Sequence, residues 1–142
     1  MLFAHERIDR DATRQLILEM HGGVIDDTDL RALESCTSFA SHLWVGYIRH
    51  RPVCAWGLVP PTLLSDRAYL WLYASPAVEE FKFIFVRNSQ RVIEEMKELY
   101  PIIYGVTRIE DERAIRWVKW LGGRYNEPIN GFRTFVIGGT NG

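Results

Sequence analysis

The sequence has few of the residues that mark a disulfide-rich or metal-binding protein. Its 142 residues include two cysteines, Cys36 and Cys54, without the spacing of a Cys-x-x-Cys motif. Such usage predicts reduced thiols rather than a disulfide framework. The four histidines show neither His-x-x-x-His nor His/Cys ligand spacing, so the sequence predicts no metal site. They are His5, His21, His42 and His50.

Charge of one sign and long apolar runs are also lacking. The formal net charge is -1, and basic residues are spread among acidic ones, so we expect neither nucleic acid nor an anionic membrane as a partner. No run approaches the ~18 apolar residues of a membrane helix, and charge precedes any run of signal-peptide length. Nucleophile-elbow, Walker and dinucleotide motifs are missing. These absences favour a soluble, cytoplasmic and unprocessed protein.

The residues that are present predict one compact domain. The chain is 47% hydrophobic and 13% aromatic, which is enough to bury a sizeable core. We therefore expect a single domain over residues 1–142, with residues 138–142 as a flexible tail.

The first half of the sequence predicts two helices and a β-hairpin. Ala12, Leu16 and Met20 form a helical stripe that ends at Gly22-Gly23, and a second short helix starts near Asp27-Thr28. The hairpin follows, because two apolar aromatic runs flank a polar turn. Its strands are residues 43–48 and 53–59, and its turn is residues 49–52.

The second half alternates strands and helices. Residues 68–74 and 102–106 are apolar runs of buried-strand type, while apolar residues between Phe81 and Leu99 recur at helical spacing. A helix from Asp111 to Leu121 ends at Gly122-Gly123. On it, Ala114, Trp117, Val118 and Leu121 are spaced to share one apolar face. Residues 132–137 supply the last predicted strand.

Two stretches resemble the GNAT superfamily of N-acetyltransferases. Residues 111–122 match its Asn-x-x-Ala-Ile-x-Phe-Tyr-x-x-x-Gly pattern at Ala114, Ile115, Trp117 and Gly122, and residues 72–76 resemble the end of its central strand. The resemblance implies an α/β (α+β) fold with a mixed, mostly antiparallel sheet, a splayed strand pair and helices on both faces. Within the superfamily, the chain is most similar to the small GNAT-like internal virion proteins of short-tailed bacteriophages.

The same resemblance implies acetyl-CoA as cofactor, no metal, and an amine as acceptor. The family binds the pyrophosphate at a glycine loop before the central helix. Here that stretch is Glu79–Ile84, which has no glycine and one cation, Lys82. The other interpretation is that Glu79-Glu80 begins a helix and Phe81 is a core residue. The implied cofactor contacts are Leu72, Tyr73, Ala74, Phe81, Lys82, Phe83, Ile84 and Asp111.

Val118 stands where the family places the tyrosine that protonates the leaving thiolate. Tyr73 and Tyr104 are substitutes, because a phenol can donate a proton, or else they are core aromatics. Asp111 either contacts the cofactor or caps its helix. Cys54 with His50 is a weaker nucleophile pair, the alternative being a buried thiol. Trp120 lies off the apolar stripe, where it is either partly buried or an interface residue.

Two functions remain open. One is acetyl-CoA-dependent N-acyl transfer. The other is a catalytically inactive protein of the same fold, which acts as a phage virion or assembly component or binds a host protein. In the second case the protein lies in the host cytoplasm or the virion.

Overall fold

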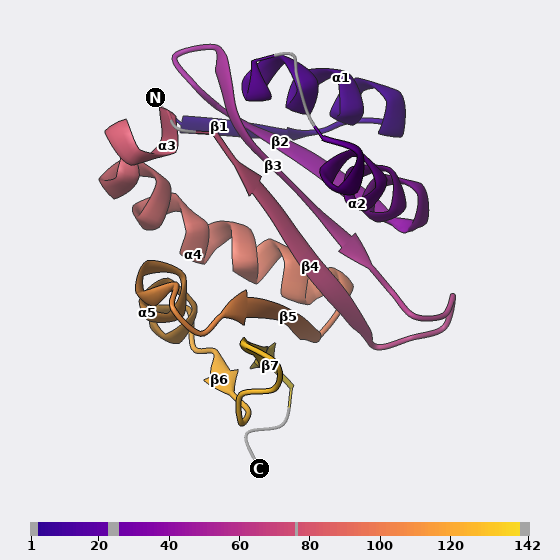
Figure 1. The fold of residues 1–142 in the computed structure, drawn as a ribbon, viewed down its shortest axis with the longest axis vertical. Helices are drawn as coiled ribbons and strands as arrows, with labels where there is room; N and C mark the ends of the chain where they lie inside the picture. The colour runs from indigo at the N-terminus through magenta and orange to yellow at the C-terminus, as the bar shows by residue number, and fades with distance from the viewer. Residues whose placement is uncertain (1–2, 23–25, 76, 140–142) are drawn as a thin grey trace. The chain divides into compact units, whose positions relative to one another are not determined.

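The computed structural model describes residues 3–22, 26–75 and 77–139. Cα packing divides the chain into two compact units. Unit 1 contains Met1–Pro60 and Trp71–Phe85, and unit 2 contains Pro61–Leu70 and Val86–Gly142. Strand β4 (Arg67–Ala74) and helix α4 (Lys82–Leu99) pass from one unit to the other (Figure 1). The expectation of a single domain stays a prediction.

Unit 1 is built on three antiparallel strands. They are β1 (Phe3–Arg7), β2 (His42–Ile48) and β3 (Arg51–Val59). Arg7 pairs with Trp44, and Trp44 pairs with Trp56, so one row of side chains crosses all three strands. Every residue from Val53 to Leu58 is buried, which is why the β3 sequence reads as a continuous apolar run.

The predicted hairpin is confirmed, with a tighter turn than expected. Only Arg49 and His50 separate β2 from β3, and both have positive φ, at 52° and 68°. Positive φ at both central residues is the geometry of the two-residue turn that matches the right-handed twist of paired strands. The polar sequence of the turn indicated its place, but not this conformation.

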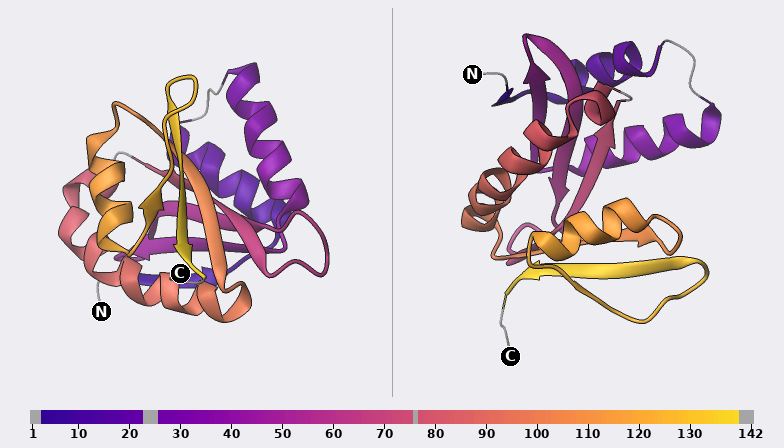
Figure 2. Two further views of the ribbon diagram at one scale, coloured as in Figure 1. Left: turned by 90° about the horizontal axis from the view of Figure 1, so that it is seen from below. Right: turned by 90° about the vertical axis from the view of Figure 1, so that its left-hand side faces the viewer.

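Helices α1 (Arg10–His21) and α2 (Asp27–Phe39) pack on the β2–β3 sheet and on each other (Figure 2). Asp9 caps α1 by accepting a hydrogen bond from the Ala12 amide at 2.7 Å. Gly22 ends α1 in the left-handed conformation, with φ of 92°. The predicted stop is therefore confirmed at Gly22, and Gly23 lies outside the described residues.

Unit 2 combines parallel and antiparallel pairing. The first half of β4 runs parallel to β5 (Ile102–Arg108), and β5 is antiparallel to β7 (Phe132–Gly138). The two-residue strand β6 (Arg124–Tyr125) pairs with the other edge of β7, and helix α5 (Glu112–Trp120) connects β5 to β6. Hydrogen bonding thus connects the strands in the order β1-β2-β3-β4-β5-β7-β6. The predicted fold class, a mixed and mostly antiparallel sheet with helices, is confirmed.

Four details differ from the sequence prediction. The helix expected to start at Phe81 is preceded by α3 (Ala77–Glu80), and Phe81 forms a turn between α3 and α4. β1 and β6 were not predicted, because each is short and partly charged. β7 includes Gly138, and the Gly139 amide donates to the Pro101 carbonyl at 3.0 Å, while residues 140–142 lie outside the described residues, so the predicted tail stays a prediction.

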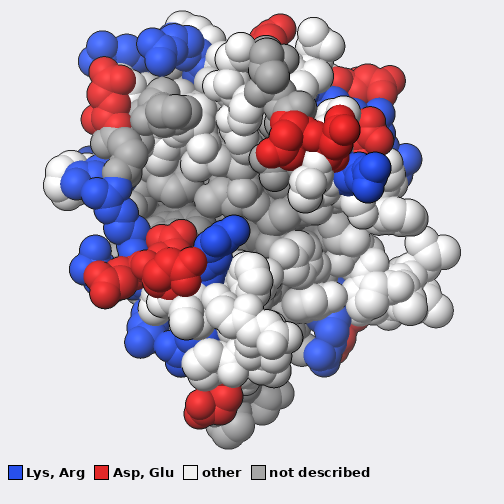
Figure 3. Space-filling model, in the orientation of Figure 1, with Lys and Arg blue, Asp and Glu red and all other residues white. Residues whose placement is uncertain are grey.

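The surface agrees with the low net charge. On the face drawn in Figure 3, acidic and basic side chains lie among one another instead of forming a block of one sign. In the described part of the chain, every helix is too short or too polar to cross a bilayer.

Candidate active site

The second half of β4 belongs to unit 1. Tyr73 is half-buried and packs with Trp71 against the core cluster of Ile17, Leu33 and Ala55, and burial raises the pKa of its phenol. Leu72 alternates to the opposite side of the strand and is 39% exposed. The sequence therefore places Tyr73 against the α1–α2 side and leaves Leu72 accessible.

A helical turn occupies the position of the expected phosphate loop. Only Ser75 and Pro76 separate β4 from α3. The Val78 amide donates to the Ser75 carbonyl at 3.0 Å, and the Phe81 amide donates to the Val78 carbonyl at 3.1 Å. Without glycine, the stretch folds as two consecutive helical segments rather than an open loop. The interpretation of Glu79-Glu80 as helix is thus confirmed for the backbone.

Two cations lie at this helical turn. Lys82 is exposed, with its ammonium nitrogen 5.5 Å from the centre of the Phe83 ring. The guanidinium of Arg49 lies 6.0 Å from the centre of the half-buried Phe81 ring. Sequence reasoning missed Arg49, because it comes from the β2–β3 turn and no spacing pattern relates it to residue 81. Phe83 is 78% exposed, so it is not a core residue.

Ser75 is a second residue that the sequence did not indicate. Its backbone amide donates to the Val53 carbonyl at 2.9 Å, which ties the end of β4 to β3. The side chain is 7% exposed, and its hydroxyl has no hydrogen-bond partner in the described structure. An unsatisfied buried hydroxyl costs about 1–3 kcal/mol, so Ser75 is a site of local strain at the end of β4.

The β4–β5 ladder is short. It contains three described pairs, from Arg67↔Ile102 to Tyr69↔Tyr104, although both strands continue beyond them. Tyr104 is half-buried and meets the Tyr69 ring edge-on, with ring centres 5.7 Å apart. Next to it, a Cβ on Gly105 would come within 2.5 Å of the Phe135 ring, so only glycine fits at that step.

Helix α5 has the packing of the resembled pattern without its acid. Val118 is 1% exposed, as predicted for a core residue. A Cβ on Gly123 would come within 2.4 Å of its side chain, so the two residues are in close contact. Asp111 caps the helix by accepting from the Ala114 amide at 3.1 Å, which confirms the capping interpretation. Trp120 is 46% exposed.

The cysteine–histidine pair is not supported. Cys54 is fully buried on β3, and burial raises the pKa of its thiol to about 12. His50 is exposed at the hairpin turn. In the ranges that the structure describes, no group of three or more His, Cys, Asp or Glu side chains could hold a metal ion.

Comparison with solved structures identifies the fold as that of GNAT acetyltransferases. An IAA acetyltransferase from Bacillus cereus is 12% identical, with 96% of this chain and 99% of that chain covered and a TM-score of 0.72. A GNAT-family acetyltransferase from Staphylococcus aureus is 16% identical, with 96% and 98% covered and a TM-score of 0.66. RimL, a ribosomal-protein alpha-N-acetyltransferase in complex with coenzyme A, is 8% identical, with 97% and 94% covered and a TM-score of 0.69.

By sequence, no family model matches the chain, and neither does any curated protein. At these identities the likeness defines the fold alone.

Restoring the family's tyrosine at Val118 will not create a catalytic acid. Val118→Tyr places a phenol in a site that is closed by Gly123 and Ile137, so we expect a loss of about 1–3 kcal/mol in the free energy of unfolding and no gain in acyl transfer. Urea denaturation measures the loss. Lys119→Tyr, at an exposed position of the same helix, is the control and changes stability by less than about 0.5 kcal/mol. Equal stabilities of the two variants would contradict this packing.

Cys54 will resist thiol reagents in the folded protein. At about pH 8, a pKa near 12 leaves roughly 10³-fold less thiolate than an ordinary thiol has. We expect Ellman's reagent to react with Cys54 only on unfolding, as measured in a Cys36→Ser variant. In a Cys54→Ser variant, the reagent measures the reactivity of the half-buried Cys36. We expect this thiol to react more slowly than free cysteine, because burial raises the pKa of Cys36 too. Rapid labelling of native Cys36→Ser protein would refute the burial of Cys54.

Proposed function

We propose that this protein binds an acyl-CoA and transfers the acyl group to an amine. The observation that carries the proposal is the length of the described β4–β5 ladder: its described pairs run from Arg67↔Ile102 to Tyr69↔Tyr104, whereas β4 continues to Ala74. A strand edge without a ladder partner offers amides and carbonyls to an extended, peptide-like ligand. The pantetheine arm of coenzyme A contains amide groups and suits such an edge.

The other end of the cofactor is an anionic pyrophosphate. Two cations lie close to the start of α4. Lys82 is the first residue of the helix, and the guanidinium of Arg49 lies over the ring of Phe81, the residue before it. The 18-residue helix α4 adds the positive end of its dipole. Glu80 is exposed and opposes them, so we expect weaker cofactor binding than a glycine loop gives. The RimL structure with coenzyme A supports the choice of ligand for this fold.

Acyl transfer needs two proton movements. A deprotonated amine attacks the thioester carbonyl, the carbon–sulfur bond breaks, and the departing thiolate takes a proton. Val118 cannot supply that proton. We assign it to Tyr73, because a phenol is protonated at neutral pH and Tyr73 lies on the part of β4 beyond its described pairs with β5. Burial raises the pKa of this phenol, which makes it a weaker acid than an exposed tyrosine. Tyr104 is the second candidate.

Calorimetric titration with acetyl-CoA and free coenzyme A tests the binding step. We expect micromolar affinity that falls by about tenfold or more in Lys82→Glu, because the substitution replaces an attraction to pyrophosphate by a repulsion. Lys119→Glu makes the same charge change on exposed α5 and should bind as the unmodified protein does. Absence of heat at millimolar ligand would reject the cofactor assignment.

A tyrosine-to-phenylalanine pair tests the acid. The assay measures the release of coenzyme A from acetyl-CoA with a panel of primary amines. For Tyr73→Phe we expect kcat to fall by about 10²-fold and KM to stay nearly unchanged, because general acid catalysis contributes roughly 10²–10⁴-fold to the rate. The alkaline limb of the pH profile should also disappear. Tyr104→Phe should retain activity. The reverse pattern would transfer the role to Tyr104.

The second candidate function is an inactive protein that binds a phage or host protein. The observation that favours it is the burial of Val118, which leaves α5 without a proton donor. Exposed aromatic rings at Phe83 and Trp120 would suit a protein contact. A phage origin, and a place in the virion or in the host cytoplasm, belong to this candidate. The titration with acetyl-CoA separates the two functions.

A further inference from the structure

Unit 1 contains a cavity of about 590 Å³ where β1 leads into α1 and α2 leads into β2. Three arginines line it: Arg7 at the end of β1, and Arg10 and Arg14 in the first turns of α1. None of the residues assigned above to the cofactor or to proton transfer lies among its lining residues. The cavity is within the 300–1,000 Å³ range that is common for small-molecule sites.

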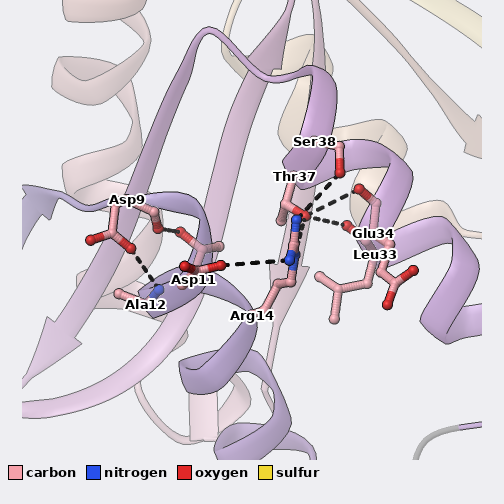
Figure 4. Close-up of polar contacts among 9 residues, drawn as sticks. Asp9, Asp11, Ala12, Arg14, Leu33, Glu34, Thr37 and Ser38 are labelled. Atoms are coloured by element: carbon pink, nitrogen blue, oxygen red, sulfur yellow. Dashed lines mark hydrogen bonds and ion pairs between the residues drawn. The ribbon is translucent and has the colours of Figure 1, made fainter.

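The guanidinium of Arg14 is held in place by α2. Its Nε donates to the Thr37 hydroxyl oxygen at 3.0 Å, and Nη2 donates to the Ser38 hydroxyl at 3.3 Å (Figure 4). Thr37 is fully buried, and its hydroxyl is within 2.9 Å of the Leu33 carbonyl. A guanidinium has five N–H donors, so several remain for a ligand while its orientation is already fixed.

Two aspartates also line the cavity and offset part of the arginines' charge. Asp9 is committed to the α1 cap through the Ala12 amide. Asp11 lies 3.6 Å from Nη1 of Arg14 and is 96% exposed, which makes it a weak and solvated ion pair. The lining side chains thus include three positive and two negative formal charges, which leaves an excess of one positive charge.

The other two arginines of the lining differ in how they are held. The guanidinium carbon of Arg7 lies 5.7 Å from the centre of the Trp44 ring, where stacking restricts it. Arg10 is exposed, and we find no ion pair or hydrogen bond of its side chain with the described residues. Ser41 also lines the cavity, and its hydroxyl lies 2.7 Å from Nδ1 of His42.

We propose that this cavity binds a phosphorylated small molecule, with the phosphoryl group held by Arg10 and Arg14. Arginine forks match phosphate oxygens in pairs, and the remaining volume accommodates the rest of the ligand. The site is separate from the acyl-CoA proposal and does not depend on it.

Titration with inorganic phosphate, followed by ¹⁵N–¹H NMR at physiological salt, tests the site. We expect saturable shifts of the Arg10–Arg14 amides and of the Arg14 Nε–H signal at millimolar phosphate. Arg10→Gln should weaken phosphate binding about tenfold without loss of fold, because Arg10 is exposed and its side chain has no hydrogen bond or ion pair with the residues that the structure describes. Arg14→Lys keeps the positive charge but removes the planar guanidinium with its paired N–H donors, so this variant should also bind phosphate more weakly.

Arg116→Gln, at an exposed position of α5, is the control and should bind phosphate normally. Linear shifts that do not saturate, or equal weakening in Arg116→Gln and Arg10→Gln, would overturn the proposal. Coenzyme A also carries phosphate, so its titration is repeated in both arginine variants. Normal coenzyme A binding there, with loss of inorganic phosphate binding, supports a separate site. If Arg10→Gln loses the binding of both inorganic phosphate and coenzyme A, the cavity is part of the coenzyme A site, and the proposal of a separate site is overturned.

Discussion

The two-sided burial of strand β3 is the constraint on which the candidate active site depends. Because Val53–Leu58 is buried throughout, its backbone groups need protein partners rather than water. β2 supplies one edge, and the Ser75 amide reaches the Val53 carbonyl. That hydrogen bond fixes where β4 ends, and the Val78–Ser75 bond then starts α3. The position of the residues proposed to bind the cofactor thus follows from the packing of a strand that precedes them in the chain.

Two glycines make that packing close. A Cβ at Gly57 would come within 2.7 Å of the Trp71 indole nitrogen, and one at Gly46 within 2.8 Å of the Cys54 sulfur. The Trp71 indole can therefore approach β3 closely at Gly57, and Tyr73, two residues further on, packs against the same core cluster. The aromatic residues of β4 are thus held by a small residue on the neighbouring strand, and this explains why glycine occurs within runs that otherwise favour strands.

The sequence predicted the parts of the fold that depend on local patterns. The hairpin, the stop of α1 at Gly22, the cap at Asp111 and the burial of Val118 all follow from spacing or from the chemistry of single residues. The turn at Phe81 did not follow, because Val78, Phe81 and Phe85 continue a helical pattern through it. Of the candidate site, the strand and helix could be located in advance. The proximity of Arg49 to Phe81 and the orphan hydroxyl of Ser75 could not, since both arise from tertiary contacts between distant segments.

Helix α5 is stabilised by contacts that do not involve a catalytic acid. The helix is stabilised by its Asp111 cap, by Val118 against Gly123, and by the Trp117 indole, which donates to the Ser89 hydroxyl at 3.0 Å. None of these contacts requires an acid on α5, so selection for packing alone would preserve the helix. Likeness to acetyltransferases at 8–16% identity is the expected result, because packing constrains side-chain size and polarity more than identity. The proposed acyl transfer therefore relies on residues of β4 and the start of α4, such as Tyr73 and Lys82, and not on α5.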